Sequence, residues 1–201
     1  MLEPGFHPVP PGHVATVVTH LRMARPEPPP GPPDAPLRLV ERPEPGWYRD
    51  LFRRVGGQDW LWASRLAMED AALTAILHDP DVALRVLEVE GRAEGMVELD
   101  LRDPRRCELA FFGLTRAAQG RGHGRALMRS ALHHGFAARP ELVVHTCTLD
   151  SPVALPFYVR SGFVPVRQEV EIIADPRLDG TLPADAAPHI PTIVAQPEGE
   201  P

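Results

Sequence analysis

The stretch QGRGHGR at residues 119–125 places three glycines and two arginines between apolar segments. A helix that begins on glycines offers free backbone N–H groups and the positive end of its dipole, and a phosphate can approach them closely. Arg121 and Arg125 add positive charge. The pattern allows two interpretations, a phosphate-binding loop or a tight turn between a strand and a helix.

The spacing of this loop excludes two common phosphate-binding motifs. A P-loop requires Gly-Lys-Ser/Thr after four spacer residues, and the chain contains no lysine. The dinucleotide-binding fingerprint requires a small residue where Arg125 or Leu127 stands. Neither motif is present.

Hydrophobic periodicity predicts the elements that position this loop. A strand at 107–114 precedes it, and a helix with one apolar face follows it and stops at Pro140. Further strands are expected at 13–21, 83–90, 95–101, 142–149 and 163–173, and further helices at about 47–55, 68–78 and 152–160. Gly56-Gly57 is expected to end the first helix, and Asp150 and Ser151 are suited to cap the last. The order β-α-α-β-β-β-α-β-α-β predicts an α/β fold of the α+β type with a mixed sheet. Only the segments after Cys107 alternate between strand and helix as in a parallel unit.

Prolines divide the chain into three regions. Of its 25 prolines, 13 lie in residues 1–45 and six in residues 176–201. We expect a Pro-rich N-terminal segment with one strand at 1–45, a single domain at 46–174 and a Pro-rich tail that follows the surface at 175–201. Residues 26–36, with seven prolines, are expected to form an extended linker or an ordered surface loop.

Composition limits the classes of partner. A formal net charge of −6 gives no electrostatic footprint for nucleic acid and suits a neutral or cationic small molecule better. No run reaches the roughly 18 apolar residues of a membrane span, and the N-terminus lacks a secretory signal pattern. Cys107 and Cys147 lie in apolar runs, as reduced cysteines do. We therefore expect no nucleic-acid or membrane partner and a cytoplasmic location.

The loop and a second motif resemble the GNAT superfamily of acyl-CoA-dependent N-acetyltransferases. Gln119, Gly122 and Gly124 match the specified positions of its signature Gln/Arg-x-x-Gly-x-Gly/Ala. Residues 155–163, LPFYVRSGF, resemble the family's second hallmark, a helix that carries a tyrosine and closes on Gly-Phe. The resemblance covers residues 83–173 well and the two preceding helices more loosely.

The resemblance implies a GNAT-like acyl-CoA N-acyltransferase fold with acetyl-CoA as co-substrate. The backbone amides of residues 120–125 would hold the pyrophosphate, and the pantetheine arm would enter a gap between the strands at 107–114 and 142–149. Gly113 suits a bulge or a close backbone approach. Ser151 stands where the family often has asparagine and would help to hold the pantetheine. The implied cofactor-binding residues are Phe112, Gly113, Leu114, Gln119, Gly120, Arg121, Gly122, His123, Gly124, Arg125 and Ser151.

Acetyl transfer to an amine needs a base and an acid. An alkyl ammonium with a pKa of about 10.4 must lose a proton, and the departing thiolate is best met by an acid. The resemblance assigns the acid to Tyr158, with simple packing of its helix as the alternative. It assigns the base to Glu108, whose pKa we expect desolvation to raise, with a solvent-facing or salt-bridged glutamate as the alternative. Two other bases remain open: His145, whose imidazole titrates in the right range, and an ordered water chain.

Other aromatic and imidazole side chains also have two interpretations. Trp47, Trp60 and Trp62 either pack in the core or form an aromatic wall of the acceptor site. His133 and His134 are adjacent on a helix and cannot share a metal ion, so no metal site is expected.

The sequence therefore predicts an enzyme that transfers an acetyl group from acetyl-CoA to an unidentified amine, carried by a small molecule or a peptide, by direct ternary-complex transfer. The alternative is a catalytically silent acyl-CoA-binding sensor or interaction module. The oligomeric state stays open at this point, and a homodimer is possible because the family often dimerises.

Overall fold

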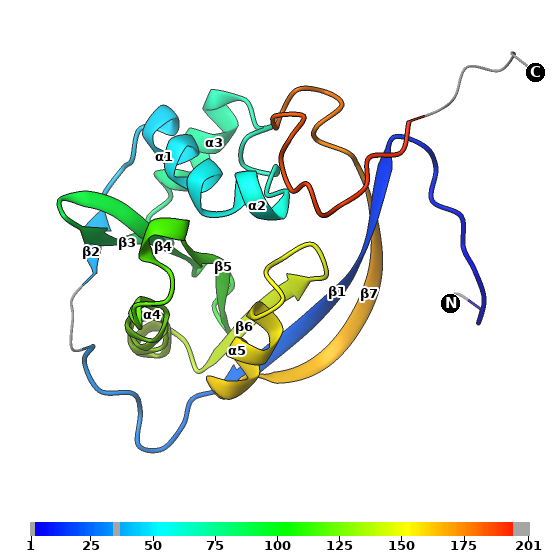
Figure 1. Ribbon diagram of the computed structural model, residues 1–201. Helices are drawn as coiled ribbons and strands as arrows, with labels where there is room; N and C mark the ends of the chain where they lie inside the picture. Colours follow the sequence, from blue (N-terminus) through cyan, green and yellow to red (C-terminus); the bar gives the residue numbers. More distant parts are fainter. Residues whose placement is uncertain (1–2, 34–36, 195–201) are drawn as a thin grey trace, which may run out of the picture.

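A seven-stranded sheet in the order β2-β3-β4-β5-β6-β1-β7 forms the centre of the computed structural model, which describes residues 3–33 and 37–194 (Figure 1). Only the β5–β6 pair is parallel among the described strands, and the other neighbouring pairs are antiparallel. This mixed sheet confirms the predicted α/β class. The strands are β1 (His13–Ala24), β2 (Arg38–Val40), β3 (Val82–Val89), β4 (Arg92–Asp100), β5 (Cys107–Leu114), β6 (Glu141–Cys147) and β7 (Val164–Ala174).

Helices cover both faces of the sheet, because successive residues of a strand point to opposite sides. On β4, Met96 packs in a core with α1 (Pro45–Phe52) and α3 (Asp70–Leu77). The neighbouring Val97 and Leu99 pack in a second core with α4 (His123–Ala138) and α5 (Ala154–Arg160). We call these two sides the α1–α3 face and the α4–α5 face.

The strand expected at 13–21 extends to Ala24 and lies inside the sheet. β1 pairs with β6 on one side and with β7 on the other, so that Val18 has both Cys147 and Glu169 as partners. Figure 1 shows β1 and β7 curving side by side. The sheet beside β6 is therefore completed by a strand from the start of the chain.

Two short elements differ from the expected order. β2 precedes α1, and the first helix does not end at Gly56-Gly57. It continues through a π-helical turn, η1 (Arg53–Gly57), into α2 (Gln58–Trp60), and ends at Leu61, whose φ is 54°. A Cβ atom on Gly56 would lie 2.0 Å from Cδ2 of Trp62. Gly56 therefore serves close packing of an indole and is not a helix stop.

The segment after β7 folds back onto α2, as the red loop in Figure 1 shows. The buried Arg177 side chain donates to the carboxylate of Asp175 at 2.7 Å and to the carbonyl oxygens of Ala186 and Ile190 at 3.2 and 2.8 Å. Leu182 packs in a small core with Leu61. Part of the predicted tail, residues 195–201, and residues 34–36 of the Pro-rich segment lie outside the described residues.

Within the described ranges, no helix combines the length and the apolar character needed to cross a membrane.

Candidate active site

The central feature of the site is a gap between β5 and β6. The two parallel strands pair only at their first residues, Cys107 with Leu142 and Glu108 with Val143, and beyond this point they separate. On its other edge β5 stays paired with β4, with a bulge that leaves Ala110 without a partner residue. The expected splay of these strands is therefore present.

Gly113 lies outside that bulge. It pairs with Met96 in regular register. A Cβ atom on Gly113 would lie 2.5 Å from Cγ1 of Val55 and 3.4 Å from Cη2 of Trp62. The close-approach interpretation of this glycine holds, and the bulge interpretation is wrong.

A cavity of about 740 Å³ runs through the gap and has walls on both faces of the sheet. On the α4–α5 face it is lined by Phe112, Phe157 and Tyr158, whose rings contact one another. On the α1–α3 face it is lined by Trp62 and by His145 of β6, among other residues. The cavity thus brings residues from both faces of the sheet to one place between the strands.

The glycine-rich loop lies at the α4–α5 end of this cavity. Gly120 and Gly122 have φ values of 76° and 81°, which favour glycine, and α4 begins without a side-chain cap. Two of the first N–H groups of α4, those of His123 and Gly124, therefore remain available to a ligand, whereas the N–H group of Arg125 donates to the carbonyl oxygen of Gly122 at 3.1 Å. Gln119 donates to the carbonyl oxygen of Leu114 at 3.2 Å, which ties the loop to the end of β5.

The predicted cofactor-binding residues divide into two groups. Those that line the cavity are Phe112, Gly113, Leu114, Gln119, Gly120, Gly124 and Ser151. Arg121, Gly122, His123 and Arg125 belong to the same loop and the first turn of α4 but lie outside the lining.

Tyr158 is buried on α5 and faces the cavity. Its ring packs against Phe112 and Phe163, with centroid distances of 6.1 and 5.9 Å. Burial, and then the negative charge of Asp150, raises the pKa of the phenol above its ordinary value. The hydroxyl group therefore stays protonated at neutral pH.

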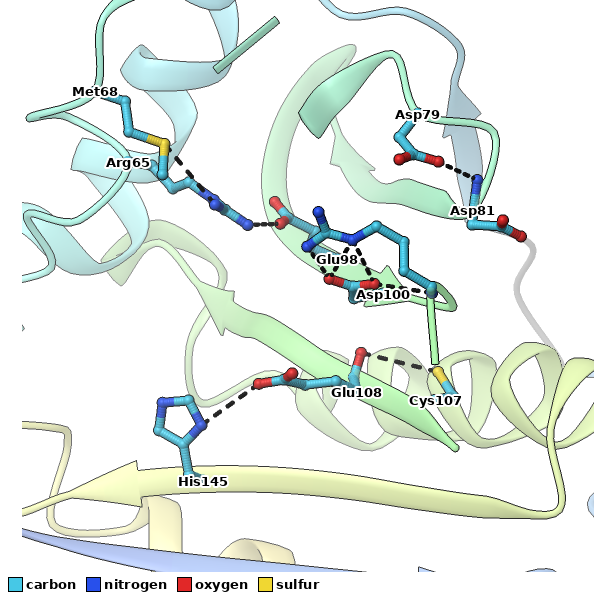
Figure 2. A network of polar contacts seen from close by, with 10 residues as sticks. Arg65, Met68, Asp79, Asp81, Glu98, Asp100, Cys107, Glu108 and His145 are labelled. Atoms are coloured by element: carbon cyan, nitrogen blue, oxygen red, sulfur yellow. Dashed lines mark hydrogen bonds and ion pairs between the residues drawn. The ribbon is translucent and has the colours of Figure 1, made fainter. Parts of the chain in front are cut away.

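Glu108 of β5 and His145 of β6 form an ion pair at the point where the two strands begin to separate, with 3.6 Å between Oε1 and Nδ1 (Figure 2). The neighbouring imidazole of His145 lowers the pKa of Glu108, so the expectation of a raised pKa is wrong. Conversely, Glu108 raises the pKa of His145, with smaller contributions from Asp150 and Glu171. His145 lines the cavity, whereas Glu108 lines a separate hollow beside Arg102 and Arg106.

Asp150 does not cap α5 as expected. Its Oδ2 accepts hydrogen bonds from Thr146 Oγ1 at 2.7 Å and from the backbone N–H of Cys147 at 2.9 Å. Its Oδ1 accepts one from the indole of Trp62 at 2.9 Å. α5 has no side-chain cap. The carboxylate is instead used to join the end of β6 to the segment after α2, a long-range contact that local sequence cannot reveal.

The three tryptophans have different environments. Trp60 and Trp62 line the cavity, and Trp47 is 38 % exposed on α1 outside it. The wall near Trp60 also includes Pro176, Asp179 and Thr181 from the C-terminal segment, none of which the sequence identified. Only tertiary folding brings this proline-rich segment to the site.

A buried polar cluster supports the α1–α3 face. Glu98 of β4 is fully buried and accepts hydrogen bonds from Arg65 Nη2 at 2.5 Å and from the hydroxyl of Tyr48. Figure 2 shows Arg65 reaching Glu98 from the segment before α3. Because a buried carboxylate needs such partners, this cluster ties α1 and the segment before α3 to β4. No group of three or more His, Cys, Asp or Glu side chains that could hold a metal ion is found in the part of the chain that the structure describes.

Comparison with known proteins agrees with this geometry. Residues 45–163 match the sequence profile of the acetyltransferase (GNAT) family. No curated protein matches the chain in sequence.

Solved structures with a similar fold include a GNAT-family protein from Novosphingobium aromaticivorans, with a TM-score of 0.58, 18 % identity, and coverage of 84 % of this chain and 69 % of that one. A GCN5-related N-acetyltransferase from Sphaerobacter thermophilus has a TM-score of 0.57, 16 % identity and coverage of 84 % and 53 %. An aminoglycoside N-acetyltransferase in complex with CoA has a TM-score of 0.50, 18 % identity and coverage of 69 % and 93 %. The chain thus spans only about half to two thirds of the length of the first two structures and of several others with this fold.

Proposed function

The chain belongs to the acetyltransferase (GNAT) family, whose co-substrate is acetyl-CoA, and from this premise we propose that it transfers the acetyl group directly to an amine within a ternary complex. The observation that carries the proposal is the cavity through the gap between β5 and β6, with a glycine-rich helix start at one end and His145 at the other. Two substrates entering from opposite faces of the sheet can meet there.

The α4–α5 end fits the coenzyme. The N–H groups of His123 and Gly124 at the start of α4 and the positive end of its dipole suit a pyrophosphate. Gly120 has no other atom within 4 Å of where a Cβ would stand, so a phosphate can approach its backbone. Arg121 and Arg125, beside these amides, add positive charge.

The open edge of β5 fits the pantetheine arm and the thioester. Beyond Glu108 this edge has no strand partner in the described chain, so its backbone N–H and C=O groups can bind a ligand. Acetyl-CoA supplies the activated acetyl group as a thioester. Backbone N–H groups of β5 near the bulge at Ala110 would polarise its carbonyl oxygen, as an oxyanion hole does.

His145 is the base in the proposed reaction, and Glu108 is its positioning residue. His145 lines the cavity, where it can accept a proton from the acceptor ammonium through Nε2. Glu108 holds the Nδ1 side of the ring and compensates the positive charge that forms. This arrangement reverses the order of the two candidates expected from the sequence.

Tyr158 supplies the acid. A tyrosine hydroxyl is protonated at neutral pH, so the group can donate its proton to the sulfur as the thiolate departs. Its ring is fixed by Phe112 and Phe163 on the same side of the gap as the glycine-rich loop.

The test is release of free thiol from acetyl-CoA across a panel of amines, amino acids, aminoglycosides, polyamines and peptides. At least one acceptor should support release, and Tyr158→Phe should lower kcat by about 100-fold while acetyl-CoA still binds. Full turnover by Tyr158→Phe would contradict the role of this residue. Tight acetyl-CoA binding without transfer to any amine would favour the silent binding module.

Three expectations stay predictions. They are the division of the chain at residues 45 and 174, the cytoplasmic location and the homodimer.

A further inference from the structure

The indole of Trp62 lies across the gap between β5 and β6 on the α1–α3 face. On the β5 side its ring contacts Phe111, with 5.3 Å between centroids, and its Cη2 lies 3.4 Å from where a Cβ atom on Gly113 would stand. On the β6 side its Nε1 donates to Asp150 at 2.9 Å. Trp62 therefore spans the opening through which the cavity passes from one face to the other.

The position of this indole is fixed from several directions. Gly56 leaves the space that the ring occupies, since a Cβ there would overlap it, and Phe52 packs against it at 5.4 Å between centroids. Asp150 is itself held by Thr146 and by the backbone of Cys147. A ring with packing on one side and a hydrogen bond to an anchored carboxylate on the other cannot easily move aside.

The proposed path of the coenzyme ends at this ring. From the glycine-rich loop the pantetheine arm would follow β5 at Phe112 and enter the gap from the α4–α5 face, so that the acyl group points toward Trp62. We infer that Trp62 is a specificity-determining residue that limits the transferred acyl group to the size of acetyl. This inference rests on the proposed function.

The test measures binding of CoA, acetyl-CoA and butyryl-CoA, for which no acceptor is needed. We expect wild-type protein to bind butyryl-CoA at least about tenfold more weakly than acetyl-CoA, because two more methylene groups would have to displace a fixed ring. Trp62→Ala should reduce this ratio to about threefold or less.

Two further variants separate this role from a general effect on packing. Trp62→Phe keeps an aromatic ring, removes the hydrogen bond to Asp150 and is a milder change if the alanine variant folds poorly; it should reduce the ratio partly. Trp60→Ala is the matched control, because Trp60 also lines the cavity but packs edge-on against His189 near the C-terminal segment. For Trp60→Ala, the ratio of the affinities for acetyl-CoA and butyryl-CoA should equal that of the wild-type protein.

Equal affinity of wild type for acetyl-CoA and butyryl-CoA would overturn the inference. So would an unchanged ratio in both Trp62 variants, or the same loss of discrimination in Trp60→Ala. A failure to transfer acetyl to any amine would instead count against the proposed function, and the binding ratios would still decide the role of Trp62.

Discussion

At the scale of single residues, the pair of Glu108 and His145 sets the pH at which the proposed base becomes active. The ionised Glu108 stabilises the imidazolium form, with help from Asp150 and Glu171 and against the desolvation of the ring. A base must be neutral before it accepts a proton. On the acidic side of the pH profile, kcat/KM should therefore rise with pH, and the midpoint of this acidic limb should lie above the pKa of about 6.5 that is usual for histidine.

Glu108→Gln should move this acidic limb to lower pH, since the largest source of the raised pKa is removed. The limb should be measured as kcat/KM against pH with one amine acceptor. Glu88→Gln is the matched control, because Glu88 pairs with Arg38 at 2.8 Å on β3, three strands away from β6, and should leave the limb in place.

His145→Gln should lower the rate by about 100-fold or more, the usual contribution of a general base. The opposite pattern, with Glu108→Gln inactive and His145→Gln active, would show that the glutamate itself is the base, as the sequence first suggested.

The types of these residues were predictable, but their relationship was not. Glu108 and His145 are 37 positions apart in the sequence, and they meet only because β5 and β6 are parallel neighbours that begin to separate beside them. The raised pKa expected for Glu108 assumed an apolar slot, and the imidazole partner reverses that direction.

At the scale of elements, two glycines let the α1–α3 face approach the sheet closely. Gly56 in η1 accommodates the ring of Trp62, and Gly113 on β5 accommodates Val55. Periodicity placed β5 at its observed bounds, Cys107–Leu114, and most other strands within a few residues. Sequence analysis wrongly predicted a helix end at Gly56-Gly57, because a glycine that is needed for packing looks the same in the local sequence as a glycine that ends a helix.

Gly56→Ala should lower the free energy of unfolding by about 1–3 kcal/mol, the usual cost of overpacking a core. Urea denaturation measures the change. Gly46→Ala in α1 is the control: no atom lies within 4 Å of the added methyl group, and alanine favours a helix, so its stability should stay equal or rise slightly. Equal stability of the two variants would show that Trp62 can move aside, which would also weaken its role as a size limit.

At the scale of the whole molecule, the walls of the cavity have two origins. The matched family profile ends at residue 163, and it begins at α1. The glycine-rich loop, β5, β6 and α5 lie within it. Several cavity residues do not: Thr16, Val18, Glu171, Ile173, Pro176, Asp179 and Thr181.

This division explains what the sequence could predict. The motifs around Gln119 and Tyr158 indicate the family and its co-substrate, because binding of the coenzyme depends on local backbone conformation. The end of the cavity that we propose for the acceptor includes residues of β1, β7 and the segment after it, which local motifs do not relate to one another. We therefore expect the choice of amine to depend in part on residues outside the family match.

The central claim is that the gap between β5 and β6 is the acetyl-transfer site, and a crystal structure of the chain with bound CoA tests it most directly. We predict pyrophosphate oxygens at hydrogen-bond distance, about 2.7–3.2 Å, from backbone nitrogens of residues 120–125, with the pantetheine arm between the two strands and the sulfur beside the Tyr158 hydroxyl. CoA bound elsewhere on the molecule, or β5 and β6 paired along their full length in the complex, would contradict the claim.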